Sequence, residues 1–294
     1  MSEIVWLGDQ DCHDAEQVGA KAANISQIAA DFKVPCGFAL SVEAFSRWCE
    51  PGRLNQSGKT DIANVPDDFK KHVANAYRQL AETVGEETPA VAVRSSATDE
   101  DSSGASFAGQ HDTYLNITGE DAITAAIVKC WNSLQNTEAI AYREAAGIAL
   151  DGARMAVLVQ HLVASDTSGV VFSANPITGN RDEVMINMSW GLGEAIVGGM
   201  VTPDTFTVSK GDFKITSENI AEKMTMTVST PNGTKEVDVP RIMRSAPSAS
   251  PEQVIEAAKM ATALEEQLGW PVDAEFAFQG ADLYLLQARP ITTL

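Results

Sequence analysis

The sequence predicts an α+β protein in which a helix-rich first half is followed by a strand-rich second half. Apolar residues recur at helical spacing in several segments before residue 150. From residue 155 onward, short β-type runs alternate with turns of Gly, Pro, Asn and Asp. This change along the 294-residue chain predicts two lobes, residues 1–160 and 161–294, and the chain is long enough for both to have a core.

The helices predicted in the first lobe have recognisable starts or ends. Pro66 and Gly85 bound the clearest amphipathic segment, as expected for a helix start and a helix end. Ser41 is a plausible N-cap, and Thr118-Gly-Glu-Asp121 has the pattern of a capping box. The predicted helices cover residues 18–32, 41–48, 66–85 and 118–134.

From residue 155 onward the chain is predicted to consist mainly of short strands. In chain order these read MAVLVQHLV, SGVVFSA, EVMINMSW, TFTV, FKIT, MTMTV and KEVDV. One helix is expected after them, because Ser250 and Gln253 form a capping box and Gly269 follows the last apolar position. Two strands, VDAEFAF and LYLLQAR, then close the chain.

These last two strands predict a hairpin with one polar and one apolar face. If the loop is Gly280 to Asp282, Glu275 lies opposite Gln287 and Asp273 lies opposite Arg289. The other face is then expected to be core, with Ala274, Phe276, Phe278, Tyr284 and Leu286. A carboxylate beside an amide oxygen offers ligands for Mg²⁺, and an arginine beside them offers a phosphate clamp. The alternative is a solvent-facing side of an edge hairpin with a surface ion pair.

The composition sets limits on function. A formal net charge of −19 argues against a broad nucleic-acid surface or an anionic membrane patch, because both need clustered cations. No apolar run is long enough for a membrane span, and the first residues lack the pattern of a secretory leader. We therefore expect a cytoplasmic protein with reduced cysteines. The histidines have no metal-binding spacing.

Three further segments could contact a small anion. Lys21 follows Gly19 and Ala20 at a predicted helix start, where backbone N–H groups favour an anion. Arg94 precedes a run of Gly and Ser that could cover phosphates, or that could be a disordered surface loop. Glu194 lies among glycines in WGLGEAIVGGMVTPD, which could be a second loop over a ligand or a tight bend.

Eight motifs in a fixed order resemble the N-terminal ATP-binding domain of the phosphoenolpyruvate synthase and pyruvate phosphate dikinase family, which the rifampin phosphotransferases share. They span residues 18–292 and read VGAKAANI, VPCGF, VRSSATDEDSSGASFAGQHDTYLN, VQHLV, SGVVFSANPITG, GLGEAIVGGMVTPD, DAEFAF and LLQARPIT. The resemblance implies an ATP-grasp-type fold, in which two α+β lobes hold Mg·ATP in the cleft between them.

The resemblance also implies roles for individual residues. Lys21 and Arg94 match phosphate-binding cations, and Arg289 matches the arginine at the transferring phosphates; we expect all three to be catalytic. The implied Mg²⁺ ligands are Glu275 and Gln287. The remaining implied nucleotide contacts are Ser106, Gly109 and Gln110 in the phosphate-covering loop, Gln160, His161 and Leu162 at the adenine hinge, and Glu194 as a candidate.

The family transfers the β-phosphoryl group of ATP to a histidine on a swivelling domain and releases AMP and phosphate. The sequence contains no Thr-Ser-His signature of that domain, so we expect a phosphohistidine partner in trans and an unknown small-molecule acceptor. Two alternatives stay open, an antibiotic phosphotransferase and a non-catalytic ATP sensor. One departure concerns the motif Gly-Gly-Lys, where this chain has Ala20; an alanine is tolerated unless its φ must be positive.

Overall fold

The computed structural model describes residues 2–49, 65–97, 113–137, 140–141, 154–231, 233–292 and 294. The chain contains helices and sheets and divides into two compact units. The N-terminal unit comprises Met1–Asp31 and Pro35–Leu162, and the C-terminal unit comprises Phe32–Val34 and Val163–Leu294. Within the described ranges, no helix is both long and apolar enough to cross a membrane.

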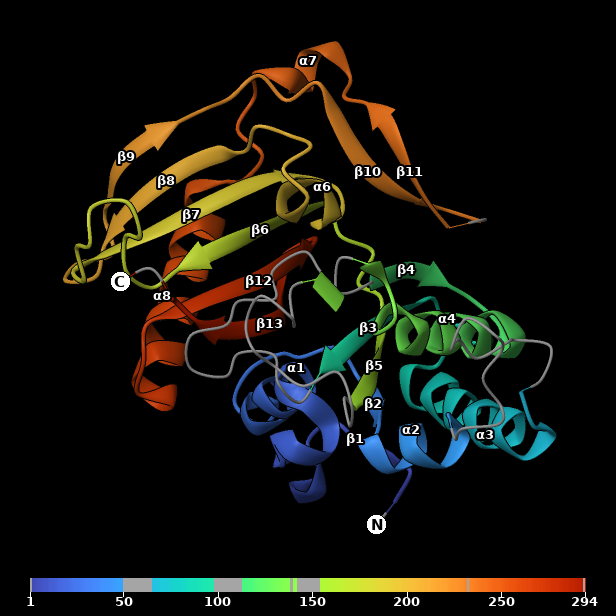
Figure 1. The fold of residues 1–294 in the computed structure, drawn as a ribbon. Coiled ribbons are helices and arrows are strands. Elements are labelled where there is room, and N and C mark those ends of the chain that lie inside the picture. The colour runs from blue at the N-terminus through green and yellow to red at the C-terminus, as the bar shows by residue number, and fades with distance from the viewer. Residues whose placement is uncertain are drawn as a thin grey trace. The chain divides into compact units, whose positions relative to one another are not determined.

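The N-terminal unit is built on a five-stranded antiparallel sheet with strand order β1-β2-β5-β3-β4. The strands are β1 (Ile4–Trp6), β2 (Gly37–Leu40), β3 (Val91–Ala97), β4 (Thr113–Ile117) and β5 (Met155–His161). The helices are η1 (Gln10–His13), α1 (Ala15–Ile28), α2 (Val42–Trp48), α3 (Asp67–Val84) and α4 (Glu120–Ser133). Helix α1 lies on one side of the sheet, and α4 lies on the other side with α3 packed beside it (Figure 1).

The core of this unit lies between the sheet and helices α2, α3 and α4. Alternate residues of β3 and β5, such as Val93 and Val159, point into it and are fully buried. Phe69 is packed between two tryptophans, with ring-centroid distances of 5.4 Å to Trp48 and 5.2 Å to Trp131. The intervening strand residues face the other side of the sheet, where α1 packs.

The helix caps show which sequence signals act locally. Ser41 accepts a hydrogen bond from the N–H of Ala44, and Gly85 ends α3 with a left-handed conformation, so both predictions are confirmed. The predicted capping box at Thr118 is wrong, because Gly119 is the N-cap of α4 and no side chain caps the helix. The N–H of Gly119 donates instead to the hydroxyl of Tyr77, a residue of α3. The start of α4 is therefore held by a contact with α3, and not by a capping side chain from its own sequence.

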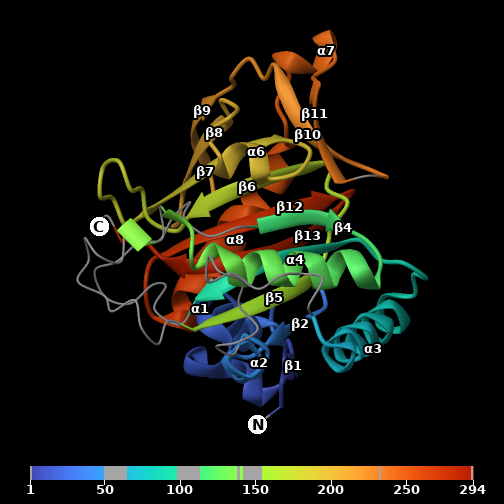
Figure 2. The ribbon, with the colours of Figure 1, turned by 45° about the vertical axis from the view of Figure 1, so that its right-hand side comes forward.

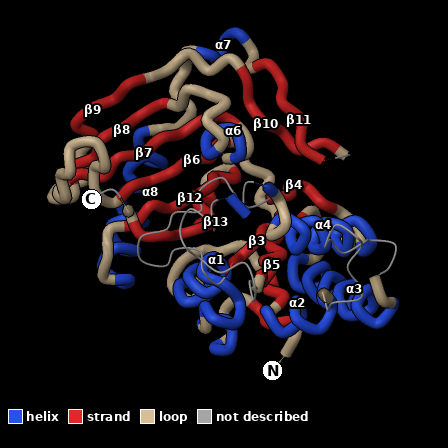
Figure 3. The backbone as a smooth tube through the Cα atoms, viewed as in Figure 1, coloured by secondary structure: helices blue, strands red, loops and turns tan. Residues whose placement is uncertain are grey.

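The C-terminal unit is built on a six-stranded antiparallel sheet with order β13-β12-β6-β7-β8-β9 (Figures 1 and 3). Its strands are β6 (Thr167–Phe172), β7 (Glu183–Trp190), β8 (Asp204–Ser209), β9 (Ile215–Asn219), β12 (Val272–Gln279) and β13 (Asp282–Pro290). A separate hairpin is formed by β10 (Thr225–Thr230) and β11 (Gly233–Asp238). The helices are α6 (Glu194–Val197), α7 (Arg241–Arg244) and α8 (Pro251–Leu268).

Helix α8 packs against β6, β7, β8 and β12 (Figure 2). Its capping box is confirmed: the hydroxyl of Ser250 accepts from the N–H of Gln253, and the side chain of Gln253 accepts from the N–H of Ser250. The sheet face that α8 covers is apolar and buried, with Val171, Ile186 and Phe276 all fully inaccessible.

The closing hairpin has the predicted pairs and a bulge that was not predicted. Glu275 lies opposite Gln287 and Asp273 lies opposite Arg289, as expected. The turn is tighter than the predicted three-residue loop, since Gln279 pairs with Asp282, and a register shift next to Glu275 restores the predicted pairs.

Because of the bulge, the buried residues of β13 differ from those predicted. Leu285, opposite Phe276, is buried, whereas Tyr284 and Leu286 are only half-buried. The prediction that Tyr284 and Leu286 belong to the core was therefore wrong, because the alternation of faces changes at the bulge. Tyr284 contacts Lys33 instead, at 4.4 Å from the ring centroid.

Candidate functional site

In the N-terminal unit, Lys21 lies next to the strand that carries Arg94. The Nζ atom of Lys21 donates to the backbone oxygen of Ser95 at 3.0 Å, and Arg94 precedes Ser95 on β3. Both cations are half-buried. The fold thus brings together the two phosphate-binding candidates, which are more than seventy residues apart in the sequence.

A close backbone contact determines where Lys21 lies. Gly19 has φ of 73° and interrupts α1, so that Lys21 is in the first turn of the second helical segment. A Cβ atom at Gly19 would lie 2.2 Å from the backbone oxygen of Ser96 and 2.3 Å from its hydroxyl oxygen. The N–H of Ala22 donates to the same hydroxyl at 3.4 Å. Only glycine therefore fits at residue 19.

Ala20 does not need a positive φ. Gly19 is the one residue of α1 with non-helical backbone angles, and Ala20 is not among the described non-glycine residues with positive φ. The departure from the family's Gly-Gly-Lys pattern therefore introduces no backbone strain.

The predicted adenine hinge lies at the end of β5. The N–H of His161 donates to the backbone oxygen of Cys36 at 2.8 Å, and the N–H of Leu162 donates to that of Ala90 at 2.9 Å. The side chain of Gln160 is buried and donates to the backbone oxygen of Pro35. These N–H groups are used within the unit itself, so an adenine at this place would have to be recognised mainly through carbonyl oxygens.

Ser106, Gly109 and Gln110, the predicted phosphate-covering residues, lie outside the described residues.

The cysteines offer no nucleophile at the candidate positions. None of the four forms a disulfide, and burial raises the pKa of the Cys12 thiol to about 11, so that this thiol is protonated at neutral pH.

In the C-terminal unit, Glu275 and Gln287 lie side by side on neighbouring strands. The next pair on the same face is an ion pair, in which the Nε and Nη2 atoms of Arg289 lie 2.8 and 2.7 Å from one oxygen of Asp273. The hairpin lies at the edge of the sheet, with β13 outermost and β12 paired to β6, so this part of the alternative interpretation is right. Asp273 and Gln287 are buried, so this face is not the fully solvated side that the alternative interpretation requires.

The polar residues of the hairpin continue as a row across the sheet. Antiparallel partners point to the same face, and the pairs at this level run from Gln287 to Glu275, Val170, Asn187 and Thr205. We call the sheet face that carries these residues the Glu275 face. Its opposite is the apolar face under α8. Neither Asn187 nor Thr205 was predicted as a site residue, because the sequence of their strands indicates only β-structure.

The glycine-rich segment around Glu194 forms a tight bend at one end of the Glu275 face. The N–H of Leu192 donates to the backbone oxygen of Thr227, and the backbone oxygen of Gly191 accepts from the hydroxyl of Ser168 at 2.7 Å. Glu194 itself is exposed and accepts from the hydroxyl of Thr234 at 3.4 Å. The bend therefore seats α6 between the β10–β11 hairpin and strands β6 and β7.

The candidate metal ligands suit a cation that keeps other ligands. Within the described part of the chain, no three His, Cys, Asp or Glu side chains are close enough to form a metal site. The oxygens of Glu275 and Gln287 are hard ligands, and Mg²⁺ is usually bound by one or two carboxylates together with waters and substrate phosphates. The two residues therefore fit Mg²⁺ held partly by a nucleotide.

A cavity of about 490 Å³ lies elsewhere in the N-terminal unit. It is lined by Ser2, Val5, Gln10, Asp11, Asp14, Gln17 and Ser41, and its two carboxylates make it unsuited to phosphates. None of the candidate site residues lines it.

Residues 15–294 match the family described as pyruvate phosphate dikinase, AMP/ATP-binding domain. The chain belongs to this family. The match covers the Lys21 segment, β3 and the closing hairpin, and it agrees with the resemblance carried by the sequence motifs.

The relatives are longer proteins. The chain is 38% identical to a probable phosphoenolpyruvate synthase of Methanocaldococcus jannaschii, over 100% of this chain and 27% of the relative. It is 34% identical to the phosphoenolpyruvate synthase of Pyrococcus furiosus, over 99% of this chain and 44% of the relative. It is 37% identical to the uncharacterized phosphotransferase YvkC of Bacillus subtilis, over 95% and 34%. The chain thus spans less than half the length of these relatives.

Among solved structures, PH1788 from Pyrococcus horikoshii aligns with a TM-score of 0.36 and 13% identity, over 74% of this chain and 81% of that chain. This similarity is too low to bear on the fold or the function.

Proposed function

We propose that the chain is the ATP-binding catalytic part of a dikinase-type phosphotransferase, and that its two units hold Mg·ATP between them in an ATP-grasp-type arrangement. Membership of the AMP/ATP-binding domain family supports ATP as the ligand. The observation that carries the proposal is the closing hairpin, where a carboxylate and an amide are paired next to a buried Asp273 that holds Arg289.

Each unit would contribute charge to one triphosphate. Lys21 and Arg94 supply cations from the N-terminal unit, and Arg289 supplies one from the C-terminal unit. Glu275 and Gln287 would hold Mg²⁺, which neutralises phosphate charge when it is bound. Phosphoryl transfer depends mainly on positioning and on this kind of charge neutralisation. Local cations of this kind allow an acidic protein of net charge −19 to bind a polyanion.

The contact between Lys21 and the Ser95 carbonyl has a role in this proposal. An exposed lysine loses much side-chain entropy when it binds a phosphate. A lysine already held beside β3 by a hydrogen bond of 3.0 Å loses less. Asp273 acts similarly on Arg289, since two contacts to one carboxylate oxygen fix the plane of the guanidinium group.

The proposed first reaction consumes ATP and an acceptor histidine. The unprotonated imidazole nitrogen forms a bond to the β-phosphorus, and the bond from that phosphorus to the oxygen shared with the α-phosphate breaks. AMP leaves with the electron pair. Water then forms a bond to the terminal phosphorus of the pyrophosphohistidine, and the bond from that phosphorus to the bridging oxygen breaks. Inorganic phosphate is released, and the phosphohistidine, which keeps the bridging oxygen, remains to phosphorylate a small acceptor.

The acceptor histidine is proposed to lie on a phosphohistidine domain outside residues 1–294. The longer relatives named phosphoenolpyruvate synthase support a final acceptor similar to pyruvate, because they match this chain over almost its whole length. Within the sequence itself, no Thr-Ser-His motif is present.

Nucleotide analysis tests the proposal. The full chain is incubated with ATP, Mg²⁺ and a phosphohistidine domain of this family, and the products are separated by anion-exchange chromatography. We expect AMP, together with an acid-labile phosphate on the added domain. ADP as the product would indicate a simple kinase instead. Tight ATP binding without any turnover would favour an ATP sensor and would overturn the catalytic role.

A further inference from the structure

The Asn187 side chain is held in place on the Glu275 face. Asn187 is half-buried on β7, two strands away from Glu275 in the same row. Its Oδ1 atom accepts a hydrogen bond from the Thr205 hydroxyl at 2.9 Å. The amide nitrogen of Asn187 makes no hydrogen bond within the described part of the chain, so its two N–H groups remain to donate.

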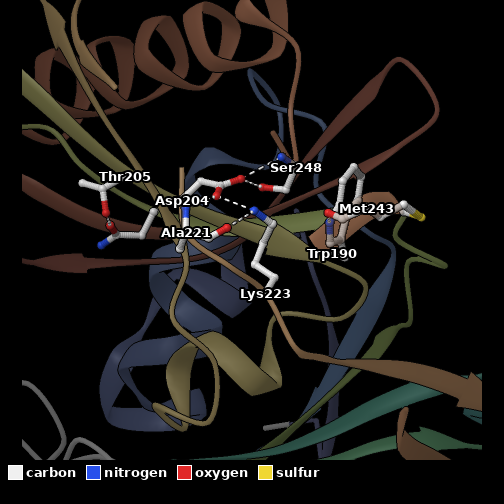
Figure 4. A network of polar contacts seen from close by, with 8 residues as sticks. Trp190, Asp204, Thr205, Ala221, Lys223, Met243 and Ser248 are labelled. Carbon is white, nitrogen blue, oxygen red and sulfur yellow. Dashed lines mark hydrogen bonds and ion pairs between the residues drawn. The ribbon is translucent and has the colours of Figure 1, made fainter. Parts of the chain in front are cut away.

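β8, the strand that carries Thr205, is itself fixed by a buried polar network (Figure 4). The Asp204 side chain is fully buried and accepts from Lys223 Nζ at 2.5 Å and from the Ala221 N–H at 2.9 Å. Its other oxygen accepts from both the N–H and the hydroxyl of Ser248, each at 2.7 Å. A buried carboxylate with this many donors is well compensated for the loss of water.

This network joins three segments of the C-terminal unit. Asp204 begins β8, Lys223 lies between β9 and β10, and Ser248 lies just before α8. Asp204 points to the α8 side of the sheet, and Thr205, the next residue, points to the Glu275 face. The network therefore anchors β8 at the place where Thr205 must hold Asn187.

We propose that Asn187 is a further nucleotide-binding residue, whose amide N–H groups donate to an oxygen of the nucleotide bound at Glu275 and Gln287. Two strand spacings separate Asn187 from Glu275, about 10 Å between backbones, which is within the span of one nucleotide. The acceptor is either a phosphate oxygen or a ribose hydroxyl. The inference rests on the proposed function, and Thr205 is a positioning residue in it.

Titration calorimetry of Mg·ATP with the full chain tests this proposal. Replacing Asn187 with alanine removes the donors, and we expect the Kd to rise by about tenfold. Thr205→Val removes the hydroxyl that orients the amide and should raise the Kd by a smaller factor. Thr207→Val is the matched control, because Thr207 lies on the same strand and face and its side chain makes no hydrogen bond within the described residues.

A double variant separates positioning from general stability. If Thr205 acts through Asn187, Thr205→Val causes no further loss of affinity in the Asn187→Ala background. Equal losses in both backgrounds would overturn the positioning role. A Kd for Asn187→Ala within twofold of the wild-type value would overturn the proposal, provided the wild-type chain binds ATP. Absence of binding by the wild type would instead refute the proposed function.

Asn187→Asp identifies the acceptor oxygen and serves as a second variant if the alanine variant does not fold. A carboxylate repels phosphate, so a larger loss than with alanine indicates a phosphate oxygen. A ribose hydroxyl can donate to the carboxylate, which preserves ATP affinity. In that case 2′-deoxy-ATP and 3′-deoxy-ATP identify the hydroxyl, since wild type binds one of them more weakly. Affinities that are equal for wild type, Asn187→Asp and both deoxynucleotides would count against any contact.

Discussion

The two groups of candidate residues are positioned by different physical means. In the N-terminal unit, Lys21 is positioned by a backbone conformation that requires glycine at residue 19 and by contact with Ser96. In the C-terminal unit, Glu275 and Arg289 are positioned by strand register and by a bulge. The first arrangement depends on the absence of a side chain, and the second depends on which side chains lie opposite each other.

This difference predicts different consequences of substitution. Side chains on the Glu275 face project from a sheet whose core lies on the opposite face, so they can be shortened without disturbing Phe276 or its neighbours. A Cβ atom added at Gly19, by contrast, meets backbone and moves it. Substitution of Glu275 should therefore affect mainly the chemistry. Arg289→Ala also removes the ion-pair partner of the buried Asp273 carboxylate, so it should cost some stability as well. Substitution of Gly19 should affect both stability and binding.

The largest expected effect is on turnover, from Glu275→Ala or Arg289→Ala. We expect either substitution to lower the rate of AMP formation by roughly 100- to 1,000-fold, because each removes a group that would stabilise charge in the transition state. The assay is AMP release in the presence of the phosphohistidine domain.

Asp282→Ala is the control for the hairpin variants. It removes a carboxylate from the same hairpin, but Asp282 is exposed and pairs with an exposed Lys33. Its rate should match that of the wild type, and circular dichroism should show the same fold for all three variants. Near-normal turnover in the Glu275 or Arg289 variant would refute the role assigned to that residue.

The next effect concerns Gly19→Ala, which should destabilise the fold by about 1–3 kcal/mol and weaken ATP binding. The substitution combines an unfavourable positive φ with overlap against the Ser96 backbone. Thermal unfolding and calorimetry measure the two effects.

Gly8→Ala separates these two causes. Gly8 also has a positive φ, of 93°, but an added Cβ would meet no atom within 4 Å. This variant should therefore lose only the energy of backbone strain and should bind ATP normally. If both glycine variants behaved alike, the contact with Ser96 would have no role in holding Lys21.

Much of the fold was predictable because its signals are local. The capping box at Ser250, the left-handed end at Gly85 and the pairing of Glu275 with Gln287 depend on residues close together in the sequence. The pairing was right although the predicted loop was too long, because the bulge near Glu275 compensates for the shorter turn. Nothing in the sequence of this hairpin indicates the bulge. The prediction that Tyr284 is in the core was wrong for this reason.

The features that were missed depend on distant partners. The Asn187–Thr205 hydrogen bond joins two strands, and the pairing of Lys223 with Asp204 brings a charged residue into the core. In the sequence, Asp204 only ends a glycine-rich motif and Lys223 lies in a connecting segment. The roles of the candidate site residues stay predictions.

A smaller effect distinguishes local from tertiary helix caps. Ser250→Ala should destabilise the C-terminal unit by about 1 kcal/mol, because it removes one hydrogen bond of the capping box. Thr118→Ala should change the free energy of unfolding by less than about 0.5 kcal/mol, since Thr118 is exposed and does not cap α4. Urea unfolding measures both. A loss of about 1 kcal/mol at Thr118 would show that this residue supports the helix start after all.

The smallest expected effect comes from Ala20→Gly, which restores the family's Gly-Gly-Lys pattern. If a second glycine were needed for phosphate binding, the variant would bind ATP more tightly than the wild type. We expect no gain in affinity, because Ala20 already has helical backbone angles and the close approach to β3 is made by Gly19. Glycine inside a helix costs about 0.5–1 kcal/mol relative to alanine, so a slightly lower melting temperature should be the measurable change. A clear increase in ATP affinity would show that the first turn after Gly19 must rearrange to bind phosphate, and that the position of Lys21 beside Ser95 is not the one it takes with the nucleotide.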